Sequence, residues 1–136
     1  MQRPLLITLP IEIKTYDIDF VNIVHNMVYI RWLEDMRLHL LADIYTMADM
    51  LADGVSPVLT RTEIDYRLPL RFGDKPIGTM WVSKLSRIKW TIEAKISVGE
   101  QQHAAAKQFG YFANLKTLRP VRIPSILQEK WAMEII

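Results

Sequence analysis

One long helical pattern interrupts a chain that otherwise has the periodicity of β-strands. Between about Met27 and Ala52 there is no proline or glycine. Apolar residues recur there at steps of three and four, as one face of an α-helix requires: Val28, Trp32, Leu33, Met36, Leu40, Ile44, Met47 and Leu51. We expect this stripe, methionines included, to pack in the core rather than to line a ligand pocket. An unbroken helix of this length would exceed ~35 Å, so we expect a bend or break near Ala42 to Tyr45, and Gly54 is expected to end the helical segment.

The segments around this pattern alternate apolar and polar residues, which is typical of strands with one buried face. Residues 5–15 form the first such segment, in which Pro10 indicates an edge strand or a bulge. Four more segments follow, at 58–66, 77–85, 88–98 and 103–115, with turns expected at Phe72–Lys75 and at Gly99-Glu100. In the last segment, Ala104–Ala106 indicate that another element approaches closely, and Gly110 indicates a bulge.

The order of these elements predicts the fold class. A strand, a long helix, four strands and a short helix over Ser125–Met133, with Pro124 at its first turn, indicate an α+β protein. We expect about five antiparallel strands in one sheet against the helix. With 136 residues the chain suits a single domain spanning residues 1–136. One helical layer leaves sheet edges and an apolar face to be covered, which favours a homo-oligomer.

Composition excludes several classes of function. A net charge of +2 is too small to indicate nucleic-acid binding, and a chain without cysteine has no disulfide or thiolate metal site. No metal-ligand spacing, nucleophilic triad motif or glycine-rich phosphate loop occurs, so we expect neither metal nor cofactor. Pro4 and Pro10 break the short apolar run at the N-terminus, which reads as neither a signal peptide nor a membrane span. We therefore expect a cytoplasmic protein that has no membrane partner.

Two carboxylates directly precede the helical pattern. Asp17 and Asp19 are two residues apart, so in a strand-like run they would point to the same side just before the helix begins. The first turn of a helix has unpaired N–H groups and partial positive charge, which can polarise an oxygen while a nearby carboxylate acts as base or nucleophile. This arrangement suits acyl transfer. The alternative is that one of Asp17, Asp19, Asn22 or Asn26 only caps the helix.

Three stretches carry a resemblance to a known family. The first is the Asp-x-Asp motif at residues 17–19 followed by Val24, His25-Asn26, Tyr29, Trp32 and Glu34. The second is Tyr66, Pro69 and Arg71–Asp74, and the third is residues 112–124, which end in Arg119–Pro124. In this order they resemble the hotdog-fold acyl-CoA thioesterases of the 4-hydroxybenzoyl-CoA thioesterase type, and the first is also similar to the motif of plant acyl-ACP thioesterases. The resemblance implies a hotdog fold, in which an antiparallel sheet wraps around one long central helix.

The resemblance also implies a reaction, the hydrolysis of an acyl-CoA or aroyl-CoA to the free acid and coenzyme A. In the family the second Asp of the motif acts as nucleophile or general base, and a backbone N–H near the helix start polarises the thioester carbonyl. These roles fall on Asp19 and on the N–H of Asn26. His25 is a candidate for orienting water or substrate, and the alternative is an exposed histidine without a catalytic part.

Substrate contacts are implied in the same way. Coenzyme A carries phosphates, and Arg87 and Lys89 begin a strand where family members place nucleotide contacts; the alternative is that they only increase solubility. The family's acyl pocket lies between two subunits of a homodimer or homotetramer. Tyr29 and the segment containing Ser56, Val58 and Thr60 would then meet the helix start of a neighbour.

Three positions depart from the family pattern. Asn22 stands where the bacterial enzymes usually have glycine, Ile23 stands where the acyl-ACP enzymes have histidine, and Val28 replaces a frequent polar residue. Two other functions therefore stay open, those of a non-catalytic acyl-thioester binding protein and of an acyl-ACP thioesterase.

Overall fold

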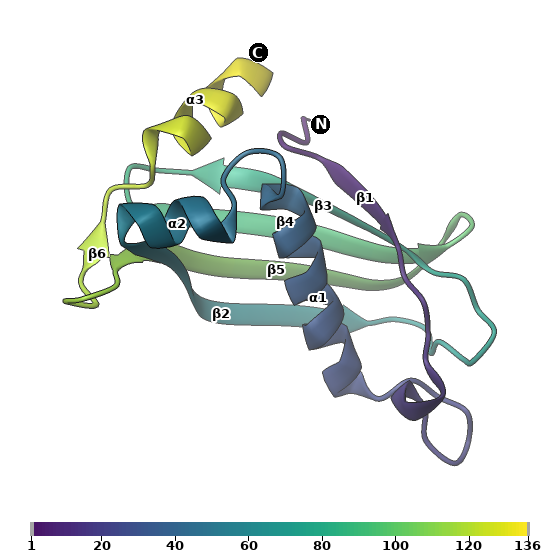
Figure 1. The fold of residues 1–136 in the computed structure, drawn as a ribbon. Coiled ribbons are helices and arrows are strands. Elements are labelled where there is room, and N and C mark those ends of the chain that lie inside the picture. Colours follow the sequence, from purple (N-terminus) through teal and green to yellow (C-terminus); the bar gives the residue numbers. More distant parts are fainter. Residues whose placement is uncertain (1, 136) are drawn as a thin grey trace.

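A six-stranded antiparallel sheet and three α-helices make up the fold in a computed structural model that describes residues 2–135. The elements are β1 (Ile7–Pro10), a 3-10 helix η1 (Thr15–Asp17), α1 (Asn26–Leu41), α2 (Met47–Asp53), β2 (Val55–Tyr66), β3 (Ile77–Leu85), β4 (Lys89–Val98), β5 (Gln101–Asn114), β6 (Pro120–Val121) and α3 (Ser125–Glu134). The strand order is β1-β3-β4-β5-β2, and the short β6 pairs with β5. Figure 1 shows α1 crossing one face of this sheet. The predicted α+β class is confirmed.

The long helical pattern forms two helices instead of one long central helix. Helix α1 ends at Leu41 and α2 begins at Met47, so the predicted break is confirmed. The new start is made by a capping box, in which the Thr46 hydroxyl accepts the Asp49 N–H and the Asp49 carboxylate accepts the Thr46 N–H. Gly54 ends α2 in the left-handed conformation, with φ of 69°, as predicted. Only α1 therefore crosses the sheet.

Helix α1 packs on the sheet through the face that the sequence predicts. Val28, Leu33, Met36 and Leu40 are buried together in the core. Gly78 of β3 lies directly beneath this face, because a Cβ there would stand 2.5 Å from the Met36 sulfur. Within α1 the apolar stripe is thus core, as expected, and the helix axis is fixed against the sheet. For Met47 and Leu51 the expectation is wrong: they are 61% and 64% exposed, because α2 starts as a separate helix and does not continue the buried face of α1.

The first predicted strand is much shorter than the sequence indicates. Its alternation persists, since Ile11 and Ile13 are buried, but only Ile7–Pro10 pair with β3. Leu5 has a φ of 55° on one side, and η1 bends the chain on the other. Pro10 does lie on an edge strand, as predicted.

Gly110 allows a close contact between neighbouring strands. A Cβ at this position would stand 2.2 Å from Cζ2 of Trp90 and 2.2 Å from the carbonyl oxygen of Val58. The predicted bulge lies opposite Gly110, in β2, where the register shifts between Leu59 and Arg61. The Trp90 indole then donates through Nε1 to the carbonyl of Tyr111 at 3.1 Å.

The terminal helix α3 covers one end of the sheet, next to β3. It begins after Pro124, as predicted, buries Leu127, and donates from Nε1 of Trp131 to the carbonyl of Val82 at 2.9 Å. Within residues 2–135, no helix combines the length and the apolar character needed to cross a membrane.

Candidate active site

The loop between η1 and α1 holds Asp19 by one of its two carboxylate oxygens. Oδ1 accepts the backbone N–H groups of Val21 and Ile23, each at 3.0 Å. Two backbone hydrogen bonds close the same turn, from Asp19 N–H to the Ile23 carbonyl and from Asn22 N–H to the Asp19 carbonyl. Within residues 2–135, Oδ2 has no hydrogen-bond partner. One oxygen therefore orients the carboxylate, and the other is available for chemistry.

Asn22 stands where the resemblance implies a glycine, and it keeps the backbone conformation that a glycine would adopt. Its φ is 60°, in the left-handed region that favours glycine, and asparagine is among the residues that tolerate this region best. Its side-chain oxygen also accepts the Phe72 N–H at 2.9 Å. This departure from the family pattern therefore preserves the loop and ties it to the turn after β2.

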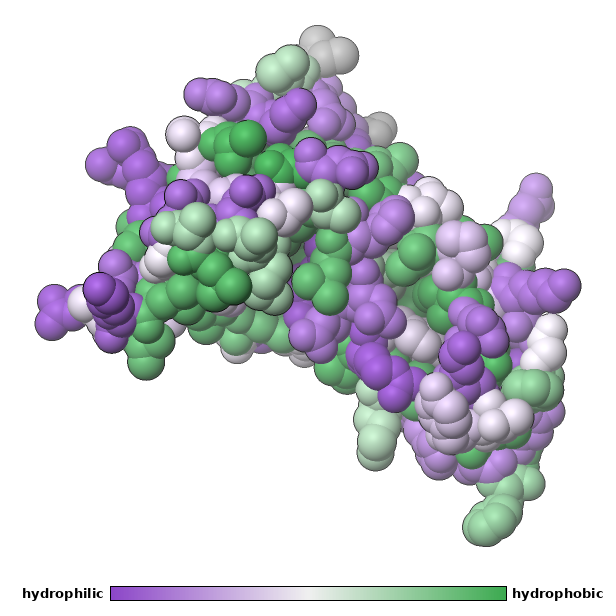
Figure 2. Space-filling view, viewed as in Figure 1, coloured by the Kyte–Doolittle hydropathy of each residue, from purple (hydrophilic) through white to green (hydrophobic). Residues whose placement is uncertain are grey.

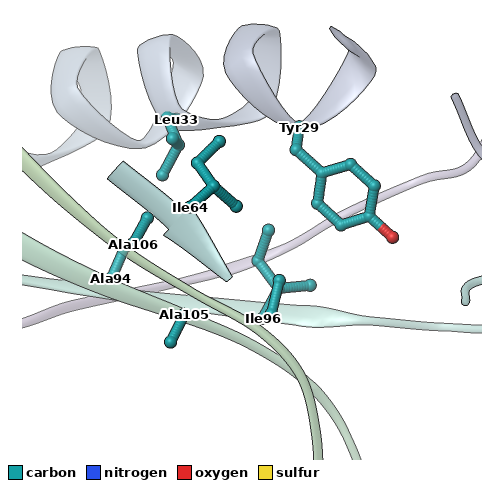
Figure 3. A pocket seen from close by; sticks show the side chains of 8 residues that line it. Tyr29, Leu33, Ile64, Ala94, Ile96, Ala105 and Ala106 are labelled. Atoms are coloured by element: carbon teal, nitrogen blue, oxygen red, sulfur yellow. The ribbon is translucent and has the colours of Figure 1, made fainter. Parts of the chain in front are cut away.

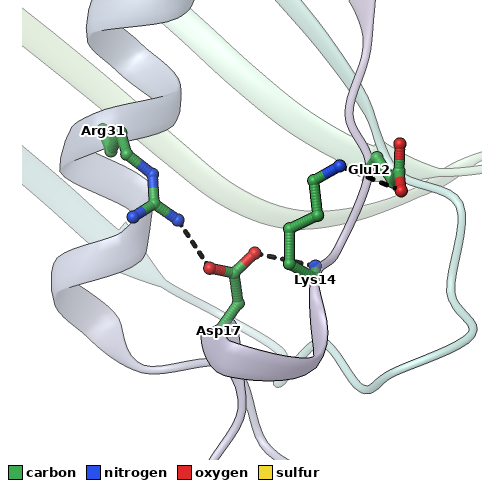
Figure 4. A network of polar contacts seen from close by, with 4 residues as sticks. All are labelled: Glu12, Lys14, Asp17 and Arg31. Carbon is green, nitrogen blue, oxygen red and sulfur yellow. Dashed lines mark hydrogen bonds and ion pairs between the residues drawn. The ribbon is translucent and has the colours of Figure 1, made fainter.

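Asp17 has a different environment from Asp19. Its side chain is 1% exposed, Oδ1 accepts from Nη2 of Arg31 at 2.5 Å, and Oδ2 accepts the Lys14 N–H at 2.8 Å, as Figure 4 shows. Both oxygens are thus occupied, and the Asp17 carbonyl accepts the His25 N–H at 3.0 Å. The strand-like run expected here is wrong, because η1 precedes a single β-bridge between Ile18 and Val24. Asp17 therefore connects η1 to α1 through Arg31, whereas Asp19 bonds only within its own loop.

The start of α1 has free N–H groups. His25 is the N-cap residue, and its side chain makes no capping hydrogen bond. The side chains of Asp17, Asp19 and Asn22 accept from other groups, so the capping alternative is wrong for them. The first backbone bond runs from Val28 N–H to the His25 carbonyl at 3.0 Å. In the described part of the chain, the N–H groups of Asn26 and Met27 have no acceptor. Unpaired N–H groups at an exposed helix start can stabilise a negatively charged oxygen.

An aromatic cluster anchors this helix start to the sheet. The Tyr66 hydroxyl, at the end of β2, donates to the Asn26 carbonyl at 3.0 Å. The Tyr66 ring meets the Tyr29 ring edge-on at 5.0 Å, and Tyr29 lies 5.1 Å from Trp32. Burial, and then the neighbouring Tyr66, raise the pKa of Tyr29 to about 12.

Tyr29 lines a small cavity beneath α1. Figure 3 shows Leu33 and Tyr29 descending from the helix toward Ile64, Ile96 and the small residues of β4 and β5. Ala104–Ala106 line this cavity on the side of β5. The cavity holds only about 10 Å³, roughly one water, so within one chain Tyr29 is a packed core residue.

The predicted substrate contacts gather at the opposite end of the sheet. Tyr111 of β5 pairs with Val58 on one side and with Lys89 on the other, whereas Tyr66, beside the α1 start, pairs with Ala104. Ala104 and Tyr111 are seven positions apart along β5, which corresponds to about 24 Å. Ser56 and Thr60 lie in β2 at the Val58 end, where their hydroxyls donate to the carbonyls of Pro57 and Phe109, and Arg87 and Lys89 are exposed. One chain therefore places Asp19 in the loop that leads into α1, with His25, Asn26 and Tyr29 at the start of that helix, and keeps the other predicted residues at the opposite end of the sheet.

Comparison with known proteins identifies the family. A family model described as the thioesterase-like superfamily matches residues 13–131, which is most of the chain. The chain belongs to this superfamily.

Individual proteins resemble the chain at low sequence identity. YneP of Bacillus subtilis (strain 168), provisionally named an acyl-CoA thioesterase, is 28% identical over 80 residues, which are 58% of this chain and 58% of YneP. The chain thus matches less than two thirds of that relative's length. The DHNA-CoA thioesterase of Staphylococcus aureus has a TM-score of 0.86 at 19% identity, covering 94% of this chain and 89% of that one. BH1999, a gentisyl-coenzyme A thioesterase, has a TM-score of 0.81 at 19% identity over 89% and 98% of the two chains. These likenesses confirm the hotdog fold.

The structural roles of two residues, Arg31 and Tyr66, cannot be recognised in the sequence. The role of Arg31 cannot be read from the sequence, because its pairing with Asp17 across 14 positions depends on how η1 turns back onto α1. Tyr66 belongs to the second stretch that resembles the family, but only the structure shows that its hydroxyl holds the helix start.

Proposed function

We propose that this protein hydrolyses acyl-CoA or aroyl-CoA thioesters to the free acid and coenzyme A. The observation that carries this proposal is the Asp19 carboxylate, with one oxygen anchored and one free, in the loop that leads into the uncapped start of α1. Membership of the thioesterase-like superfamily supports the same class of reaction. So do the names of YneP and BH1999, which describe those proteins as thioesterases.

The chemistry follows from these two groups. The Asn26 N–H donates to the thioester carbonyl oxygen and, with the positive end of the helix, stabilises the negative charge that develops there. The free oxygen of Asp19 takes a proton from an attacking water, or attacks the carbonyl carbon itself, in which case water hydrolyses the acyl-enzyme. Both routes break the carbon–sulfur bond and release the thiolate, a good leaving group: in the first as the water adds, and in the second as the acyl-enzyme forms, before water hydrolyses it to the free acid. His25, exposed at the N-cap, orients the water or the substrate.

A homodimer would join the two groups of predicted residues. Strand β2 is 12 residues long and lies at the edge of the sheet, so its outer side offers a long row of unpaired backbone groups. Strand β2 could pair antiparallel with β2 of a second copy, with the twofold axis at the middle of the strand. This pairing would place Ser56–Thr60 of one copy beside the α1 start of the other. Arg87 and Lys89 would then lie at the end of the sheet toward which the coenzyme A phosphates extend.

The mass in solution tests this assembly. We expect light scattering after gel filtration to give twice the 15.9 kDa chain mass, or a multiple of that dimer. A protein that stays monomeric while it hydrolyses thioesters would contradict the shared site but not the reaction.

The reaction is tested by thiol release across a panel of short, long and aromatic acyl-CoAs. We expect saturable hydrolysis of at least one ester, and a loss of at least about a hundredfold in Asp19→Asn. Asp43→Asn is the matched control, because Asp43 is exposed in the α1–α2 connection, away from the loop. A folded wild-type protein that hydrolyses none of the esters would overturn the proposal.

A further inference from the structure

The first turn of α1 is held through a carbonyl group instead of through its N–H groups. The Tyr66 hydroxyl, at the end of β2, donates to the Asn26 carbonyl at 3.0 Å, whereas the N-cap residue His25 contributes no side-chain hydrogen bond. A capping side chain would stabilise the helix, but it would occupy an N–H group of the first turn. The bond from Tyr66 stabilises the same turn and leaves the Asn26 N–H free for a substrate.

The start of α1 lies at the surface, where an unsupported helix end frays. Asn26 is exposed, and Met27 is 76% exposed. Figure 2 shows this end of the molecule, at the lower right, with mostly hydrophilic side chains at its surface. Helix ends lose order easily, because the N–H groups of the first turn have no partner within the helix. The bond from the sheet therefore determines how rigidly the Asn26 N–H is held.

Residues 66–70 hold both halves of the proposed site. The Leu70 carbonyl accepts the Val24 N–H at 2.9 Å, in the stretch between Asp19 and the helix. Tyr66, four positions earlier, bonds to the helix start itself. One short piece of chain at the end of β2 therefore fixes the loop and the helix start relative to each other.

The Tyr66 hydroxyl is itself held in place and able to donate. Its ring meets the Tyr29 ring edge-on at 5.0 Å, and Tyr29 is 3% exposed. Burial raises the pKa of Tyr66, so its hydroxyl stays protonated at neutral pH. A phenylalanine at this position would keep the ring contact and lose the hydrogen bond. The role of the hydroxyl can therefore be separated from that of the aromatic packing.

We propose that Tyr66 is a positioning residue for the hydrolysis, whose hydroxyl keeps the first turn of α1 closed and the Asn26 N–H aimed at the thioester carbonyl oxygen. This inference rests on the proposed thioesterase reaction. A donor that is oriented in advance stabilises the charge that develops on this oxygen without having to reorganise during the reaction. Its bond to the oxygen strengthens as that charge grows, so a poorly held donor lowers kcat more than it raises KM.

Tyr66→Phe tests the proposal through this difference between kcat and KM. We expect kcat for the best acyl-CoA of the panel to fall by about fivefold, the value of one neutral hydrogen bond, while KM stays within about twofold. Tyr111→Phe is the matched control, because Tyr111 lies in β5 seven positions from Ala104, the residue that pairs with Tyr66, and it should keep the wild-type kcat. An unchanged kcat in Tyr66→Phe would overturn the proposal. So would a loss that disappears when the assay is cooled below a lowered melting temperature, since Tyr66 would then act on stability alone.

The carbonyl stretch of a bound substrate reports the donor directly. The most tightly bound acyl-CoA of the panel, labelled with carbon-13 at the thioester carbonyl, is bound to Asp19→Asn, and its infrared difference spectrum is compared with that in Asp19→Asn/Tyr66→Phe. A hydrogen bond lowers the frequency of a carbonyl stretch, so we expect a smaller downshift in the protein that lacks the Tyr66 hydroxyl. Equal band positions would contradict the proposal. A wild-type protein that hydrolyses none of the esters would overturn the reaction, whereas the band position of a bound ester would still decide the role of Tyr66.

Discussion

Asp17 is predicted to stabilise the fold rather than to take part in hydrolysis, and Asp17→Asn separates the two roles. Both carboxylate oxygens of Asp17 accept a hydrogen bond, one from Arg31 and one from the Lys14 N–H. An asparagine keeps one acceptor oxygen and places an NH2 group where the other was. Because its side chain is 1% exposed, this NH2 group must face one of the two donors.

The expected cost follows from which of the two donors loses its acceptor. The Arg31 side chain is 53% exposed and can turn to water, so the asparagine oxygen is expected to stay on the Lys14 N–H. The loss is then one hydrogen bond to a charged group, about 2 kcal/mol. For a chain of 136 residues, the entropy of unfolding is roughly 0.3 kcal/mol per degree, so the melting temperature should fall by about 7 °C.

Thermal unfolding followed by circular dichroism measures this shift. Glu12→Gln serves as the control, because Glu12 and Lys14 form an exposed ion pair at 3.0 Å, also drawn in Figure 4, whose loss should leave the melting temperature nearly unchanged. If Asp17→Asn melted within about 2 °C of the wild type, or no lower than Glu12→Gln, the reasoning about the buried carboxylate would be refuted.

Three further substitutions or titrations test other parts of the structure. Gly110→Ala is expected to destabilise the protein by about 3 kcal/mol or more, measured by urea unfolding, because the new methyl group would overlap Trp90 and the Val58 carbonyl; an unchanged midpoint would contradict the close packing of these strands. Asn22→Gly should preserve the melting temperature to within a few degrees, while Asn22→Val should lower it clearly, because only the valine is strained at a φ of 60°; equal melting of the two would be inconsistent with this turn. Tyr29 should ionise near pH 12 in a spectrophotometric titration. Because the pKa of Tyr29 in the folded protein lies above the ordinary value of 10, the stability that Tyr29 contributes is complete below pH 10 and is lost as the pH rises toward 12. Ionisation of Tyr29 near pH 10 in the folded protein would contradict its burial.

The sequence predicts most of the fold because its patterns are local. The strand pattern locates β3 at residues 77–85. Gly54 and Gly99 adopt the left-handed conformation, the first at the end of α2 and the second in the turn between β4 and β5, where they were expected. The break between α1 and α2 follows from helix length and from the capping residues at Thr46 and Asp49. The length of β1 could not be predicted, because pairing with β3 ends where Leu5 and η1 turn the backbone away, although the apolar alternation continues.

The site is predictable only in part, because the distances between its residues depend on tertiary structure. The motif predicts that Asp19 and Asn26 come together at the start of a helix, since they are close in the sequence. The different partners of Asp17 and Asp19 depend on a 3-10 turn that the alternation of apolar residues conceals. The separation of Lys89 from the helix start follows from strand register, which a single sequence does not disclose.

The central claim is that the free oxygen of Asp19 carries out the hydrolysis. Asp19→Asn tests it directly, because an amide oxygen can still accept from Val21 and Ile23 while the free anionic oxygen becomes an NH2 group. The decisive measurement is kcat/KM of this variant for the best acyl-CoA of the panel, at a temperature where variant and wild type are both folded. We predict a fall of at least about a hundredfold with an unchanged melting temperature. A variant that retains wild-type kcat/KM would contradict the account.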